Sequence, residues 1–223
     1  MNQELANVLK LYTTKPHKEL NDYLIGKSKD NIIGMLVDLI TMYINDKNSS
    51  TIREFITVTL AGYNHKEGKI GYNVFKQDAF VHGKTLMCEA KPKNCDTNSD
   101  NIYKLRGAGN FSDYTFSRLE RDSKEDCLNM LVSGFIDGKL IYILEFPFKY
   151  ENFISILRKQ LLKRFPGGKD IPNEYLRSAE FHYKHFIDCP ELKIIYLIEK
   201  DKLGDYKPYI VRDFYKILEA KTK

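Results

Sequence analysis

Apolar residues in the first sixty positions of the chain recur with the period of an α-helix. Helical spacing is followed by a set of apolar residues that can share one face of a helix: Ile32, Ile33, Leu36, Leu39, Ile40 and Tyr43. Ser50 then begins a second segment with the same spacing, and Gly62 ends it. Residues 1–62 are therefore predicted to form a helical N-terminal portion, whose last helix packs against a sheet.

After this portion the period changes to that of a strand. From Thr85 to Lys91 apolar and polar side chains alternate, and successive side chains of a strand point to opposite faces. This alternation places Glu89 and Lys91 together on one face of the predicted strand.

Two apolar segments, residues 130–136 and 140–146, flank the dipeptide Asp137-Gly138, which is typical of a two-residue hairpin turn. We expect these two strands to form the centre of the sheet. Later spacing predicts a helix, a buried strand and a closing helix over residues 151–165, 192–198 and 211–220.

This order of elements predicts an α/β fold with a central mixed β-sheet flanked by helices. A chain of 223 residues with 43% hydrophobic residues can bury one sizeable core. We therefore expect a single domain over residues 1–223, with the sheet and its flanking helices in residues 63–223.

Composition adds two expectations. The 35 Lys and Arg residues exceed the 30 Asp and Glu residues, and the net charge of +5 suits a polyanionic partner such as nucleic acid. The four cysteines lack C-x-x-C spacing, the start lacks a signal-peptide pattern, and the longest apolar stretch is shorter than the roughly 20 residues that span a bilayer. These patterns predict a reduced cytoplasmic protein without a membrane partner.

Candidate chemistry lies in the strand that carries Glu89 and Lys91. Asp78 precedes Glu89 with ten residues between them, and His82-Gly83-Lys84 supplies a tight turn. A hairpin there would bring two carboxylates and an ammonium together. Asp78, Glu89 and the backbone carbonyl of Ala90 would bind Mg²⁺, with Mn²⁺ as a substitute. Lys91 would orient the attacking water or counter negative charge on a phosphate.

At these residues the chain resembles the PD-(D/E)XK nuclease superfamily. Asp78 matches the first acid, Glu89 the second acid and Lys91 the lysine, whereas Gln77 stands where the family often has Pro. The resemblance covers about residues 51–146. Among the members, type II restriction endonucleases are the most similar in kind.

The resemblance implies a Mg²⁺-dependent, site-specific hydrolysis of double-stranded DNA that leaves a 5′-phosphate. Cutting both strands of a palindromic site requires two active centres, so a homodimer is expected. The acid-x-Lys pattern also occurs at residues 67–69, 205–207 and 219–221. Only the copy at Glu89 lies in an alternating strand that follows an acid-bearing one.

Further residues extend this predicted site. Glu54 is a candidate additional acid, with an exposed helix acid as the alternative. The segment after the hairpin offers Arg106, Asn110, Arg118 and Arg121 as DNA contacts, because Arg and Asn can read base edges and glycines between them let the backbone approach a phosphate. The alternative is an ordinary loop and helix start with solvated arginines.

Three other interpretations remain open at this stage. The hairpin can be a solvated surface with an incidental Glu–Lys pair, the protein can be a repair or junction nuclease of the same fold, or it can be a non-catalytic DNA-binding module. A zinc site at His182, His185 and Cys189 is disfavoured, because the alternation from Phe181 to Ile187 predicts a strand with the two histidines on opposite faces.

Overall fold

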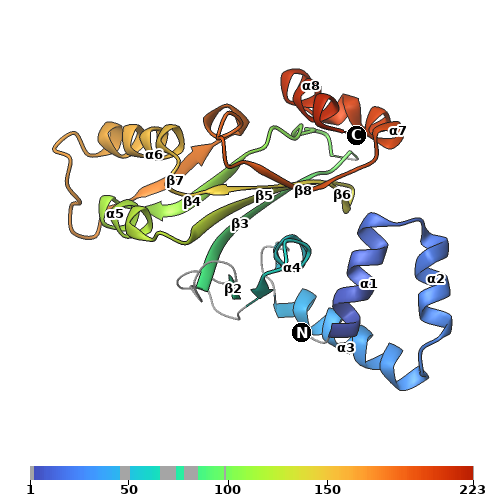
Figure 1. Cartoon of the computed structure of the whole chain (residues 1–223). Helices are drawn as coiled ribbons and strands as arrows, with labels where there is room; N and C mark the ends of the chain where they lie inside the picture. The colour runs from blue at the N-terminus through green and yellow to red at the C-terminus, as the bar shows by residue number, and fades with distance from the viewer. Residues whose placement is uncertain (1–2, 46–50, 66–73, 78–84, 98, 223) are drawn as a thin grey trace.

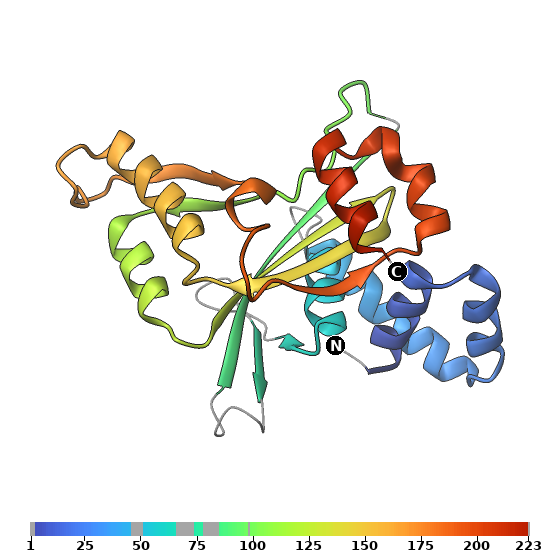
Figure 2. The same ribbon diagram turned by 45° about the horizontal axis from the view of Figure 1, so that its top comes forward.

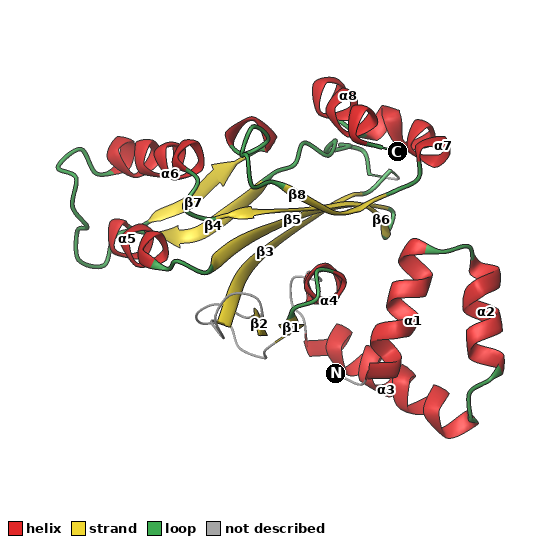
Figure 3. Cartoon of the chain, viewed as in Figure 1, coloured by secondary structure: helices red, strands yellow, loops and turns green. Residues whose placement is uncertain are grey.

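The computed structural model describes residues 3–45, 51–65, 74–77, 85–97 and 99–222 (Figure 1). The described residues form a mixed β-sheet with helices packed on both of its faces (Figure 3). The predicted class, a central mixed sheet flanked by helices, is confirmed.

The described strands of the main sheet lie in the order β1-β2-β3-β5-β6-β8. They are β1 (Asn64–His65), β2 (Val74–Gln77), β3 (Thr85–Cys95), β5 (Leu128–Ile136), β6 (Lys139–Pro147) and β8 (Lys193–Leu197). Strands β3 and β5 are parallel, and the other neighbours are antiparallel. Strands β5 and β6 are inside the sheet and joined at Asp137-Gly138, as predicted; both turn residues have positive φ, which this kind of turn requires.

One face of the sheet is covered by the N-terminal helices. They are α1 (Gln3–Thr14), α2 (His17–Ile25), α3 (Lys29–Asn45) and α4 (Thr51–Leu60). Helix α4 lies directly against the sheet (Figure 1), where Phe55 and Val58 share a core with Cys88 and Ala90 of β3. The helices predicted within residues 1–62 are therefore present.

Helix α3 differs from the expectation in what it buries. Its period is helical, but the side chains of Ile33 and Leu36 are 48% and 53% exposed, while Met35 is buried. The helix packs mainly against α1 and α4. Helical spacing thus predicted the element but not the face that is covered.

The other face carries a larger core under the remaining elements. They are β4 (Gly109–Tyr114), α5 (Phe116–Lys124), α6 (Glu151–Arg164), β7 (Leu176–Phe181), the 3₁₀ helices η1 (Tyr183–His185) and η2 (Gly204–Tyr209), α7 (Lys200–Leu203) and α8 (Arg212–Lys221). Strands β4 and β7 pair into a second small sheet beside α5 and α6 (Figure 2). Phe111, Phe153 and Phe181 join these elements through ring contacts of 4.9 to 6.4 Å.

Two strand predictions are corrected by the structure. The strand over residues 193–197 is present but lies at the edge of the sheet, half-exposed rather than buried. The segment from Phe181 to Ile187 is not a strand, because β7 ends at Phe181 and a 3₁₀ turn follows. That turn brings the rings of His182 and His185 together, tilted by 43° with centroids 4.1 Å apart, whereas a strand would have separated them.

All four cysteines are free thiols. Within the described ranges, the helices are too short or too polar to cross a membrane.

Candidate active site

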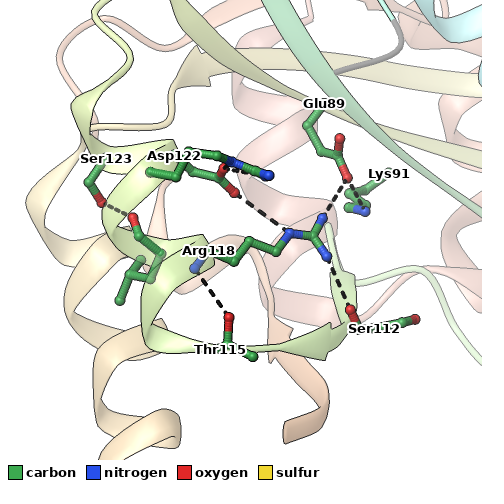
Figure 4. A network of polar contacts seen from close by, with 9 residues as sticks. Glu89, Lys91, Ser112, Thr115, Arg118, Asp122 and Ser123 are labelled. Carbon is green, nitrogen blue, oxygen red and sulfur yellow. Dashed lines mark hydrogen bonds and ion pairs between the residues drawn. The ribbon is translucent and has the colours of Figure 1, made fainter. Parts of the chain in front are cut away.

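Glu89 and Lys91 meet on the face of β3 that points toward β4 and α5. The Lys91 Nζ donates a hydrogen bond to Glu89 Oε1 at 2.6 Å (Figure 4). The two side chains are 17% and 19% exposed, so solvent reaches both. Their shared face was predicted from the alternation and is confirmed, because the intervening Ala90 turns into the opposite core.

Arg118 of α5 reaches over this pair from the other layer. The helix begins after Thr115, whose side chain accepts a hydrogen bond from the Arg118 N–H at 3.2 Å. One guanidinium nitrogen lies 3.7 Å from Glu89 Oε1, and the other donates to the Ser112 carbonyl at 3.1 Å (Figure 4). Glu89 therefore lies between two cationic groups.

Aromatic rings of β4 lie against the cationic groups of Lys91 and Arg118. The ring of Phe111 lies 4.6 Å from Lys91 Nζ and 5.4 Å from the Arg118 guanidinium, and Tyr114 lies 5.3 Å from the same guanidinium. Cations are attracted to ring faces at such distances. Strand β4 thus positions the two cationic groups of the site.

Asp122 anchors Arg118 one helical turn along α5. Its side chain is only 2% exposed, and its carboxylate lies 3.8 Å from Arg118 Nε and 2.7 Å from an Arg121 Nη (Figure 4). Asp122 is not among the site residues predicted from the sequence. The four-residue spacing of Arg118 and Asp122 on a predicted helix was the signal available.

The structure separates the other predicted DNA contacts into two groups. Asn110 accepts a hydrogen bond from Lys93 Nζ at 3.0 Å, and Lys93 continues the face of β3 that carries Lys91. Arg106, about half exposed, lies 3.8 Å from Glu180. Burial and the charge of Lys91 lower the pKa of Lys93, which marks a positive stretch beside the acid. Arg121 instead turns to Asp122.

The glycines of this segment serve packing. Gly107 has a φ of +54°, and a Cβ there would come 2.9 Å from the Phe214 ring. Its N–H donates to the buried hydroxyl of Tyr142 at 3.2 Å. Gly107 therefore allows close packing under α8.

The structure describes two of the three predicted metal ligands, Glu89 and Ala90. Asp78 lies outside the described residues. Glu89 uses Oε1 for both of its cationic neighbours, and Oε2 makes no hydrogen bond or ion pair with a described residue, which leaves a carboxylate oxygen for a metal ion. In the described part of the chain, no three His, Cys, Asp or Glu side chains form a metal-binding group.

The backbone carbonyl of Ala90 points to the β2 edge of β3. The Met87 N–H donates to Cys127 O at the β5 side, at 2.8 Å, and backbone groups of a strand alternate between its two edges. The carbonyl of Ala90 is therefore directed to the β2 edge, where the register sets Gln77, the residue before Asp78, opposite Thr85, four positions along β3 from Glu89.

Glu54 lies on α4, which packs on the opposite face of β3 from Glu89. Burial raises the pKa of the Cys88 thiol on that face, and the carboxylate of Glu54 is among the nearby charges that add to the shift. Glu54 therefore belongs to the helix on one face of β3, whereas the Glu89–Lys91 contact lies on the other face.

A second polar cluster, which the sequence analysis missed, lies under α4. Glu145 of β6 is 7% exposed and accepts hydrogen bonds on Oε1 from the Tyr63 hydroxyl at 2.7 Å and from Asn129 Nδ2 at 2.6 Å. Burial, followed by the charge of Glu145, raises the pKa of Tyr63. The Tyr63 phenol therefore remains a hydrogen-bond donor to the buried carboxylate.

No protein-family model matches the chain, and no curated protein is significantly similar to it.

Proposed function

We propose that this protein is a Mg²⁺-dependent endonuclease that hydrolyses phosphodiester bonds of double-stranded DNA, as a site-specific type II restriction enzyme of the PD-(D/E)XK type. The observation that carries the proposal is the contact between Lys91 and Glu89 on one face of β3, with Glu89 Oε2 left free. Strand β2, which ends one residue before Asp78, pairs antiparallel with β3, and the superfamily places its two acids on such neighbouring strands. The register sets Gln77 opposite Thr85, four positions along β3 from Glu89.

Asp78, Glu89 and the Ala90 carbonyl would hold the metal ion. A bound Mg²⁺ would lower the pKa of a coordinated water and neutralise charge on the phosphate. The Lys91 ammonium would turn from Glu89 Oε1 to the attacking water and fix its direction. Arg118 would add positive charge beside the phosphoryl oxygens as negative charge develops on them.

The positive stretch beside the pair would contact the DNA backbone. Lys93, Asn110 and Arg106 follow Lys91 along the same side of the molecule. Cleavage of both strands would need a homodimer, with an interface formed by the helices of the first sixty residues or by α6.

The test is digestion of phage DNA by the purified chain with Mg²⁺, followed by mapping of the ends. Fixed fragments with 5′-phosphates, produced with Mg²⁺ or Mn²⁺ and abolished by EDTA, are the expected result. Cuts that follow DNA structure rather than sequence would favour a repair or junction nuclease instead.

Metal titration separates the enzyme from a non-catalytic DNA-binding module. Isothermal titration with Mn²⁺ should show binding that is lost in Asp78→Ala and in Glu89→Ala. The matched control is Asp205→Ala, which alters another acid-x-Lys copy outside the site. DNA binding without cleavage and without metal binding at these acids would overturn the proposal.

A further inference from the structure

A cavity of about 710 Å³ lies at the β8 edge of the sheet, between the end of α1, the start of α2 and α7 with η2. In both overall views the end of α1 approaches this edge (Figures 1 and 2). Three strand spacings separate β8 from β3, so the cavity is distinct from the Glu89–Lys91 pair. Its volume lies within the range of small-molecule sites in proteins.

The cavity carries an excess of positive charge. Its cationic side chains are Lys10, Lys15, Lys139 and Lys202. Glu199, the only carboxylate among the described residues that line it, is paired with Lys202 at 2.5 Å. Lys10 and Lys15 form no ion pair within the described ranges of the chain. An anion would balance these charges.

Lys139, the first residue of β6, is the least solvated of these cations. Its Nζ donates to the Tyr12 carbonyl at 3.0 Å, lies 3.1 Å from His17 Nε2 and lies 4.2 Å from the centre of the Tyr12 ring. Burial lowers the pKa of Lys139, and no described carboxylate offsets that effect. An ammonium has three N–H donors, so one remains for a ligand after the carbonyl and the imidazole.

Two tyrosines form an aromatic wall beside these cations. Tyr196 of β8 and Tyr206 of η2 both line the cavity and are half-buried. Burial raises the pKa of Tyr196 to about 12, with contributions from Glu199 and Tyr206, so the phenol is neutral at physiological pH. A neutral aromatic side chain can stack on a planar base.

We propose that this cavity binds a nucleotide, with its phosphate at Lys139 and Lys15 and its base against Tyr196 and Tyr206. The cavity and its charges do not depend on the proposed nuclease function. The phosphate can belong to a free nucleotide or to the 5′-end of a DNA strand, since the recognised groups are the same.

Calorimetric titration of the full chain in EDTA tests the proposal and prevents metal-dependent cleavage during the measurement. The probes are inorganic phosphate, AMP and a short duplex with a 5′-phosphate. AMP should bind saturably and more tightly than phosphate. Removing a charge-assisted contact in Lys139→Ala should weaken AMP binding roughly tenfold or more. Lys149→Ala, an exposed lysine outside the cavity, should leave it unchanged.

Two further variants keep the test decisive if Lys139→Ala fails to fold. Lys15 is exposed, so Lys15→Glu should preserve the fold and weaken AMP and phosphate alike. Tyr206→Leu should weaken AMP but not phosphate. Competition between the duplex and AMP would support the strand end as the source, and AMP binding without competition would support the free nucleotide. Equal affinity for phosphate and AMP, no AMP binding, or full affinity in Lys15→Glu would overturn the proposal.

Discussion

Gly109, the first residue of β4, lies directly against the side chain of Lys91. A Cβ at position 109 would come 2.8 Å from Lys91 Cβ and 2.5 Å from the Phe181 ring. Real Cβ contacts are longer than this, so only glycine lets β4 lie so close to β3. Because Gly109 has no side chain, β4 can pack directly against Lys91, which contacts Glu89.

Gly109→Ala should displace β4 and the Lys91 side chain. The added methyl group is overpacking in a filled core, which costs about 1–3 kcal/mol of unfolding free energy. Urea unfolding measures the loss, and the proposed DNA cleavage should fall with it. Gly167→Ala is the matched control, because a Cβ there meets no heavy atom within 4 Å. Equal stability of the two variants would contradict the packing argument.

Lys91→Ala should reduce DNA cleavage by about 10²- to 10³-fold or more, because it removes a positioned donor beside the phosphate. Binding of DNA in the absence of metal should change little, since the neighbouring positive groups remain. Rates of plasmid cleavage and gel-shift affinities measure the two effects. Lys207→Ala removes the lysine of another acid-x-Lys copy and should retain full activity. Full activity in Lys91→Ala would refute the catalytic assignment.

Arg118→Ala and Arg121→Ala separate catalysis from stability at Asp122. Each variant removes one cation from a carboxylate that is 2% exposed, so each should lower the unfolding free energy by about 1–3 kcal/mol. Only Arg118 also lies near Glu89. Cleavage at saturating DNA should therefore fall in Arg118→Ala alone. A similar loss of cleavage in both variants would show that Arg118 acts only through the fold of α5.

Asp170→Ala should loosen the start of α5. The carboxylate of Asp170 accepts hydrogen bonds from the N–H groups of Phe116 and Ser117 and from the Ser117 hydroxyl, at 2.5–2.8 Å. Loss of such a helix cap costs about 0.5–2 kcal/mol. Desolvation raises the pKa of Asp170, but the hydrogen bonds from Ser117 and Phe116 outweigh it and lower the pKa below its ordinary value.

The pH dependence of this cap follows from that direction. A carboxylate with a lowered folded-state pKa contributes its full stability above the unfolded value of about 3.9 and loses it as the pH falls through the folded pKa. The difference in unfolding free energy between the original chain and Asp170→Ala should therefore shrink below about pH 4. A difference that is constant from pH 7 to pH 3 would contradict the role of the ionised carboxylate.

Tyr63→Phe should destabilise the cluster under α4. It removes a hydrogen bond to buried Glu145, at a cost of about 1–3 kcal/mol. Burial and Glu145 raise the pKa of Tyr63, so its contribution is complete below the ordinary value of about 10 and is lost as the pH rises through the folded pKa. Unfolding free energy should therefore fall less steeply above about pH 10 in the variant than in the original chain. Parallel curves would contradict this assignment.

The local period of the sequence determined the elements of this protein. Alternation around Glu89 predicted β3 and the shared face of Glu89 and Lys91, and the Asp137-Gly138 turn predicted the hairpin of β5 and β6. These predictions hold because side-chain direction in a strand depends only on position along it. The same local information predicted the helices of residues 1–62 and the helix over residues 151–165.

Only the tertiary structure decided which segments meet. Arg118 reaches Glu89, Glu145 meets Tyr63 across 82 residues, and β4 pairs with β7, none of which a local period can encode. The same reason explains two differences from the predictions. The segment after Phe181 is not a strand, and apolar side chains of α3 are exposed. Alternation and helical spacing describe one segment at a time, whereas burial and contact depend on the neighbours that the whole fold supplies.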